Sequence, residues 1–315
     1  MTMKRFILAA TMAVAMIGAV PAHAQLKYDP NQVAILRWYQ ANQTTSIFLE
    51  GNPVRLAFDG FSIWATSINT DIVTKLQAND GTSLGSFSVG HNPVGVAFDG
   101  AHIWVANQGD NTVTELNASD GSLVTTVSVG TQPSDIAFDG TNIWVTNEGS
   151  NNVTKILASQ ATVVNTFSVG TAPIGVAFDG ANIWVANAHS NNVTKLGASD
   201  GKLLGTFNVG NVPIGVAFDG NNIWVSNSGS NNVTKLSKTG TTLGTFAVGA
   251  SPRGLAFDGV NIWVANGNSG NVTKLLASTG ANVGTFSLGP GTAPQGVAFD
   301  GANIWTANEG TISKL

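Results

Sequence analysis

The hydrophobic pattern of the chain repeats about every 40 residues. Short apolar runs rich in Val, Ile, Phe and Trp alternate with turns rich in Asp, Gly, Asn and Ser. The motif Ala-Phe-Asp-Gly, followed each time by Ile-Trp, ends 39 to 42 residues apart at Gly60, Gly100, Gly140, Gly180, Gly220, Gly259 and Gly301. A fixed period of this length indicates an array of similar supersecondary units.

One unit, from Pro173 to Gly210, contains four β-rich runs separated by turn residues. The runs are Pro173–Phe178, Ile183–Asn187, Val193–Leu196 and Leu203–Val209. Both side-chain parities of the first two runs are mostly apolar, which indicates that both faces of each small sheet are buried. Four antiparallel strands per unit, repeated seven times, predict an all-β, seven-bladed β-propeller over residues 44–315. A parallel β-helix is the alternative, but its coils are typically shorter than this repeat.

The two ends of the repeat region are complementary. The last unit stops at Thr311–Leu315, which matches a third strand, so its fourth strand is missing. The segment Thr44–Leu49, just before the first unit, resembles a fourth strand. We therefore expect the N-terminal strand to complete the last blade and to close the ring, so that truncation at either end destabilises the whole ring.

The first 43 residues do not follow the repeat. Lys4 and Arg5, an apolar run from Phe6 to Val20 and the small residues of Ala22-His23-Ala24 predict a signal peptide over residues 1–24, cleaved after Ala24. A retained membrane anchor is the alternative, but the run is shorter than the roughly 20 residues of a membrane span. Residues 25–43 form a lead segment, in which Val33–Tyr39 favours a short helix over an extra edge strand. The sequence thus predicts a periplasmic or secreted protein.

Composition excludes several classes of function. Only 10% of residues are charged, against about a quarter in an average soluble domain. The 14 basic and 18 acidic residues leave no basic field, so nucleic acid is not an expected partner. The absence of cysteine removes thiol nucleophiles, thiolate zinc sites and disulfides. No later segment is long and apolar enough to span a membrane, and we expect a monomer.

Residues that recur in every repeat are best explained as structural. The Asp of each Phe-Asp-Gly forms a turn, although a carboxylate ring binding cations is the alternative. The tryptophans pack between blades, although a stacking surface for sugars or bases is the alternative. The lysines of the third strand are interpreted as charges that discourage edge association, in preference to a ring that binds polyanions. They are Lys75, Lys155, Lys195, Lys235, Lys274 and Lys314, with Glu115 in their place once.

The departures from the repeat are the candidate site residues. One residue after the proline of the first strand, Arg253 and Gln295 interrupt an otherwise small or apolar series. Two residues after it, Arg55 and Asp135 interrupt a series of glycines. Because successive side chains of a strand point to opposite faces, only one of these two slots faces the central channel directly. The loops at the same mouth add His91, Glu148, His189 and Glu309.

The repeat resembles the YVTN/NHL class of β-propeller repeats. The matching elements are Pro-x-Gly-Val-Ala-Phe-Asp-Gly, Ile-Trp-Val-Ala-Asn and Asn-Asn-Val-Thr-Lys-Leu, and the resemblance covers about residues 44–315. It implies the propeller fold, and it is compatible with exported proteins, surface-layer proteins and scaffolds for protein contact. Neighbouring propeller families include virginiamycin B lyases and gluconolactonase-like metal hydrolases. Because one fold hosts many unrelated functions, the function depends on the residues of the site.

Two functions fit these residues. Two arginines at the mouth of a funnel suit a carboxylate, phosphate or sulfate group, which favours a non-catalytic scaffold that binds a small anionic ligand or a protein. A structural pairing of Arg55 with Asp135 or with backbone is the alternative. A metal-dependent enzyme like the lyases or lactonases requires a divalent cation held by a cluster of ligands. The sequence shows no His-x-x-His, no Glu-His pair and no clustered carboxylates, so no cofactor is predicted for the scaffold.

Overall fold

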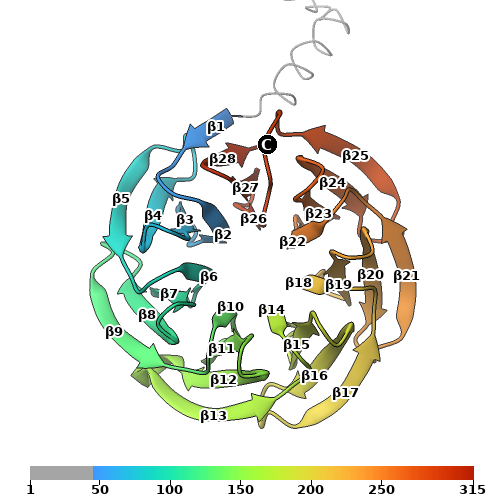
Figure 1. The fold of residues 1–315 in the computed structure, drawn as a ribbon, viewed down its shortest axis with the longest axis horizontal. Coiled ribbons are helices and arrows are strands. Elements are labelled where there is room, and N and C mark those ends of the chain that lie inside the picture. Colours follow the sequence, from blue (N-terminus) through green and yellow to red (C-terminus); the bar gives the residue numbers. More distant parts are fainter. Residues whose placement is uncertain (1–44) are drawn as a thin grey trace, which may run out of the picture. The chain divides into compact units, whose positions relative to one another are not determined.

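The computed structural model describes residues 45–315, which form a ring of seven blades. Each blade is a four-stranded antiparallel sheet, and its first strand lies nearest the axis of the ring (Figure 1). The predicted all-β seven-bladed propeller is therefore confirmed. The predicted signal peptide and the predicted helix over residues 33–39 lie outside the described residues and stay predictions.

Blades 1 to 3 follow one another along the chain. Blade 1 contains β2 (Pro53–Phe58), β3 (Ser62–Ser67), β4 (Ile72–Gln77) and β5 (Ser83–Ser88). Blade 2 contains β6 (Pro93–Phe98), β7 (His102–Asn107), β8 (Thr112–Asn117) and β9 (Leu123–Ser128). Blade 3 contains β10 (Pro133–Phe138), β11 (Asn142–Asn147), β12 (Asn152–Leu157), the 3₁₀-helix η1 (Ala158–Gln160) and β13 (Thr162–Ser168).

Blades 4 to 6 have the same order of strands. Blade 4 contains β14 (Pro173–Phe178), β15 (Asn182–Asn187), β16 (Asn192–Gly197) and β17 (Leu203–Asn208). Blade 5 contains β18 (Pro213–Phe218), β19 (Asn222–Asn227), β20 (Asn232–Ser237) and β21 (Thr242–Ala247). Blade 6 contains β22 (Pro252–Phe257), β23 (Asn261–Asn266), β24 (Asn271–Leu276) and β25 (Asn282–Ser287). The four runs predicted within Pro173–Gly210 agree with the strands of blade 4 to within one residue at each end.

Blade 7 joins the two ends of the propeller, as the sequence predicts. It contains β26 (Gly296–Phe299), β27 (Ile304–Asn308), β28 (Thr311–Lys314) and, as its outer strand, β1 (Thr45–Phe48). β1 pairs antiparallel with β28, so that Ile47 lies opposite Ile312. Leu49 extends this contact by donating its N–H to the carbonyl of Gly310. Two segments at opposite ends of the chain thus build one sheet.

The core of the propeller lies between the blades, in seven separate clusters. In each cluster the tryptophan of one blade packs against the first three strands of the next, as Trp184 does against Ile223 and Leu236. The indole N–H of each tryptophan donates to the turn aspartate of its own blade, and Trp184 Nε1 lies 2.8 Å from Asp179 Oδ2. The packing role of the tryptophans and the turn role of the aspartates are both present in the structure.

The recurring lysines have a different role from the one expected. They are on third strands, which pair on both sides, so they do not protect a sheet edge. Lys155 is 6% exposed, and its ammonium donates to the carbonyls of Ala198 and Ser199 in the next blade. The same ammonium lies 5.0 Å from the ring centroid of Trp144. The lysines are structural, and five of the six, all except Lys274, join neighbouring blades through such bonds.

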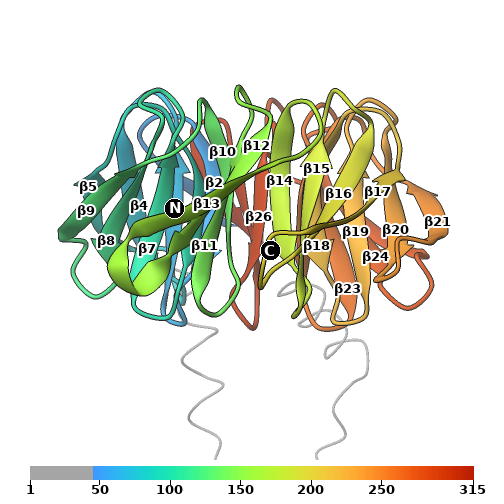
Figure 2. The same cartoon turned by 90° about the horizontal axis from the view of Figure 1, so that it is seen from below.

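The strands of the blades run between the two faces of the ring (Figure 2). We call the face with the Phe-Asp-Gly turns the Asp-Gly face, and the face where the inner strands begin the proline face. No helix among residues 45–315 has the length and apolar character needed to cross a membrane.

Candidate functional site

Of the two slots at the start of the inner strands, the second lines the central channel. A channel cavity of about 180 Å³ is bounded by Arg55, Asp135, Gly215, Gly254 and Gly296, each two residues after the proline or its equivalent. Glycine occupies most of these slots because the neighbouring inner strand approaches closely. A Cβ on Gly254 would lie 2.8 Å from the carbonyl oxygen of Gln295. Two of the seven slots therefore bring functional side chains into the channel.

Arg55 and Asp135 share the channel cavity without forming an ion pair. The guanidinium of Arg55 donates to the carbonyl of Val54. The carboxylate of Asp135 accepts the N–H of Ile136 at 3.0 Å and, more weakly, that of Val176 at 3.4 Å. Burial raises the pKa of Asp135, and the positive charge of Arg55 only partly opposes this rise. The direct partners of both side chains are therefore backbone groups, which was the structural alternative for these residues.

Arg253 lies next to this cavity, one residue before Gly254. Its Nε atom is buried and has no hydrogen-bond partner among the described residues. Burial lowers the pKa of Arg253, and the positive charge of Arg55 lowers it further. No carboxylate of residues 45–315 forms an ion pair with Arg55 or with Arg253. Arg55 in the cavity and Arg253 beside it are therefore two neighbouring arginines whose mutual repulsion is not relieved by a direct acidic partner.

Within residues 45–315, no side chain of the other predicted site residues forms a hydrogen bond or an ion pair with these arginines. The side-chain amide of Gln295 donates to the carbonyl of Ala293. His189 and Glu309 are exposed, and Glu148 is half-exposed, on the loops between second and third strands of three different blades. These loops place them on the proline face, as expected, but none forms an ion pair within residues 45–315.

His91 forms a separate contact between blades 1 and 2. Its Nδ1 lies 2.8 Å from Asp110 Oδ1, and its Nε2 lies 3.8 Å from Asp71 Oδ2. The hydrogen bond and the charge of Asp110, together with the charge of Asp71, raise the pKa of His91. The His91 side chain is 72% exposed, so this group is a surface pair.

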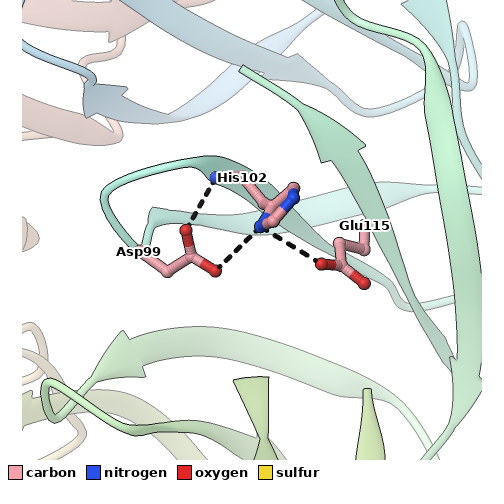
Figure 3. Close-up of side chains that lie close together, drawn as sticks. All are labelled: Asp99, His102 and Glu115. Carbon is pink, nitrogen blue, oxygen red and sulfur yellow. Dashed lines mark hydrogen bonds and ion pairs between the residues drawn. The ribbon is translucent and has the colours of Figure 1, made fainter. Parts of the chain in front are cut away.

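A second group of functional side chains lies on the Asp-Gly face, outside the channel. Asp99, His102 and Glu115 come from the turn after β6, the start of β7 and the middle of β8 (Figure 3). His102 Nδ1 lies 3.4 Å from Asp99 Oδ2 and 3.3 Å from Glu115 Oε1. One ligand atom from each residue lies within 4.8 Å of the others, a spacing that suits a metal ion.

The two carboxylates of this group have different electrostatic surroundings. Burial raises the pKa of Glu115, and the neighbouring charge of Asp99 adds to the rise while His102 opposes it. Burial also acts to raise the pKa of Asp99, but hydrogen bonds from the Trp104 indole and from two backbone N–H groups outweigh it, so the pKa is lowered. Asp99 is therefore a stable carboxylate, whereas Glu115 is a buried acid with little support from hydrogen bonds.

Comparison with known proteins identifies structures with the same architecture. No protein-family model matches the chain, and a comparison with curated proteins finds no match. A catalytically inactive virginiamycin B lyase from Staphylococcus aureus, solved with quinupristin, is 17% identical with a TM-score of 0.76, covering 86% of this chain and 98% of that one. A streptogramin B lyase is 17% identical with a TM-score of 0.75, covering 86% and 96%. Hydrazine synthase of Kuenenia stuttgartiensis is also 17% identical with a TM-score of 0.75, covering 85% and 97%. The likeness is one of fold.

Sequence reasoning missed the group on the Asp-Gly face. The sequence shows no Glu-His pair and no clustered carboxylates, but the fold brings Asp99, His102 and Glu115 together. The signal was present in the hairpin register, in which His102 pairs with Asn117 and Trp104 pairs with Glu115. His102 and Glu115 are thus diagonal neighbours on one face of the sheet, within reach of long side chains. Assigning that register from the strand pattern would have found the pair.

Proposed function

We propose that this protein is an exported, non-catalytic β-propeller that binds a small anionic group at the channel mouth beside Arg55 and Arg253. The group is a carboxylate, phosphate or sulfate, either free or displayed by a partner protein. Export to the periplasm or beyond, a monomeric state and membership of the YVTN/NHL class belong to the same proposal. They rest on the N-terminal sequence and on the motifs of the repeat.

The observation that carries the proposal is the pair of arginines without an acidic partner. Arginine presents a planar fork of donors that matches a carboxylate or a phosphate in two-point contacts. Since Arg55 and Arg253 influence each other through their charges, an anion near both would relieve their repulsion. The buried and unpartnered Nε of Arg253 supplies a donor that such an anion could use. Asp135 limits the net positive charge of the channel, which favours a small anion over a polyanion.

The size of the channel cavity also favours a small group. Its volume is about 180 Å³, below the roughly 300–1,000 Å³ of pockets that enclose drug-sized ligands. A metal-dependent enzyme, similar to the lyases that share the fold, is the alternative function. Within residues 45–315 the group with metal-ligand spacing lies outside the channel, and the cavity itself is lined by one carboxylate. This arrangement supports binding more than hydrolysis or elimination in the channel.

Calorimetric titration with inorganic phosphate, sulfate and acetate tests the proposal. The informative variants are Arg55→Gly and Arg253→Ile. Glycine and isoleucine occupy the equivalent positions in other blades, so both variants should fold. Loss of charged hydrogen bonds worth about 1.5–3 kcal/mol predicts at least roughly tenfold weaker binding in each variant. Lys202→Ser removes an exposed positive charge on the turn before β17 and should leave the affinity unchanged.

Two results would overturn the proposal. One is an affinity for all three anions that is unchanged in the arginine variants, or no binding to any of them. The other is metal-dependent turnover of a streptogramin B such as quinupristin, lost in Asp135→Asn, which would establish the enzymatic alternative.

A further inference from the structure

The interface between blades 2 and 3 departs from the repeat at four positions. Glu115 replaces the lysine found on the other six third strands, and His102 replaces the asparagine found in five blades. Val127 replaces the phenylalanine found on five outer strands. In the facing turn of blade 3, the 3₁₀-helix η1 and Ala161 replace a turn that ends in glycine in five other blades. These positions are far apart in the sequence but meet on one side of one interface.

Two of the four changes are sterically coupled. In the repeat, the outer-strand phenylalanine covers the turn glycine of the next blade, and a Cβ on Gly121 would clash with the ring of Phe87. Alanine at position 161 therefore requires a smaller residue on the neighbouring outer strand, and Val127 meets this requirement. An open groove of about 700 Å³ lies here, lined by Asp99, His102, Glu115 and η1 among others. The interface thus differs from the others in shape as well as in charge.

The other two changes invert the charge beside the tryptophan. In six blades a lysine ammonium lies 4.7 to 5.2 Å from the tryptophan ring centroid. In blade 2 the carboxylate of Glu115 occupies the same position of the strand, and its side chain is only 4% exposed. Within residues 45–315, this carboxylate accepts no hydrogen bond, and its ionic contact is with His102 Nδ1 at 3.3 Å. A buried carboxylate without strong hydrogen bonds is costly unless a cation compensates it.

The distances in the group are better suited to metal ligands than to hydrogen bonds. The separations of 3.4 and 3.3 Å from His102 Nδ1 exceed the usual hydrogen-bond range of about 2.7–3.2 Å. Ligands bound tetrahedrally to zinc at about 2.0–2.1 Å are separated by about 3.3–3.4 Å. We propose that Asp99, His102 and Glu115 bind a divalent transition-metal ion, with Zn²⁺ as the preferred ion, in the groove between blades 2 and 3.

The donor set decides between classes of metal. An imidazole nitrogen with two carboxylate oxygens suits Zn²⁺, whereas Ca²⁺ and Mg²⁺ prefer oxygen ligands alone. Three protein ligands leave a fourth position of the tetrahedron to water or to a molecule in the groove. The Trp104 indole, which donates to Asp99 Oδ2 at 2.8 Å, orients that ligand from outside the metal shell. The site is separate from the arginines of the channel and goes beyond the proposed function.

Titration of the chelator-treated protein with Co²⁺, followed by competition with Zn²⁺, tests this site. Co²⁺ reports its coordination by visible absorption, and Zn²⁺ should displace it at one equivalent. The double variant His102→Asn/Glu115→Lys installs the residues that other blades carry and should fold with the native circular dichroism. His91→Ala is the matched control, because it removes an exposed histidine that also lies near two aspartates.

We expect Co²⁺ and Zn²⁺ binding in the wild type and in His91→Ala, and none in the double variant. Glu115→Gln, which keeps the shape of the side chain, should bind at least about tenfold more weakly. The proposal is overturned if the wild type binds neither ion at millimolar concentration, since the group would then be a histidine shared between two carboxylates. It is equally overturned if the double variant binds like the wild type, or if only His91→Ala loses binding. Anion binding by the channel arginines is measured independently, so either idea can fail alone.

Discussion

The lysines that join the blades allow a graded test of how the ring is held together. Lys155 donates to two carbonyls of the next blade, at 2.7 and 3.0 Å, and lies over Trp144. Lys274 lies over Trp263 at 4.7 Å but donates to no carbonyl of the described residues. The physical reason is that these carbonyls belong to the turn that joins the third strand to the fourth in other blades, whereas in blade 7 these strands, β28 and β1, are far apart in the sequence. Replacing each lysine by methionine therefore removes different contacts while keeping a long apolar side chain.

The expected losses follow from these contacts. A hydrogen bond to a charged group contributes about 1.5–3 kcal/mol, and a cation–π contact about 0.5–1 kcal/mol near the surface. Because methionine recovers part of the loss by packing on the indole, we expect Lys155→Met to lower the unfolding free energy by about 3 kcal/mol. Lys274→Met loses only the cation–π contact, so its expected cost is about 0.5–1 kcal/mol.

Urea unfolding, followed by tryptophan fluorescence and circular dichroism, measures both losses. The two probes should give coincident transitions, because a difference in unfolding free energy is defined only for a cooperative transition. Lys195→Met, which loses one carbonyl bond, should fall between the two other variants. Equal destabilisation by Lys155→Met and Lys274→Met would refute the reasoning, because it would show that the carbonyl bonds between blades add nothing to the aromatic contact.

Two further predictions concern ring closure and pH. A chain that starts at residue 49 lacks β1 and should unfold at a lower temperature than one that starts at residue 45. The unfolding should be a single transition of the whole ring. Equal midpoints of the two chains by calorimetry would contradict this role of β1. The pKa of Asp135 in the folded protein is raised above its ordinary value near 3.8, so the stability linked to this group is fully present below that value and is lost as the pH rises through the folded pKa. The advantage of Asp135→Asn over the wild type should therefore grow from pH 3 to pH 7 in urea unfolding, and a difference independent of pH would count against the raised pKa.

The fold was predictable because its determinants are local and repeated. Each turn residue, apolar run and tryptophan appears seven times, so the strands of blade 4 could be placed to within a residue from the sequence. Closure by β1 was also predictable. The last repeat lacks a fourth strand, and the segment before the first repeat resembles one. Both conclusions depend on order along the chain and on the period of the pattern, which the sequence contains directly.

The candidate sites were predictable only in part. Arg55, Asp135 and Arg253 stood out as interruptions of the repeat. In the structure Arg55 and Asp135 line one channel cavity, and Arg253 is close enough to Arg55 for their charges to interact. Which slot faces the channel depends on the irregular pairing at the start of the inner strands, and a simple alternation of side chains does not reveal it. The loop residues His189 and Glu309 lie on the same face as the arginines, but neither lines the channel cavity.

The sequence by itself determined the number of blades, the strands and the closure of the ring, because regular hydrophobic periodicity encodes elements and their order. Only the tertiary structure showed that Glu115 lies against His102 and that the blade lysines reach carbonyls more than 40 residues away. Contacts between side chains depend on strand register and on the approach of neighbouring blades to within a few ångströms. A pattern of residue types fixes which faces are buried, whereas the position of a charged atom relative to another is decided by packing in three dimensions.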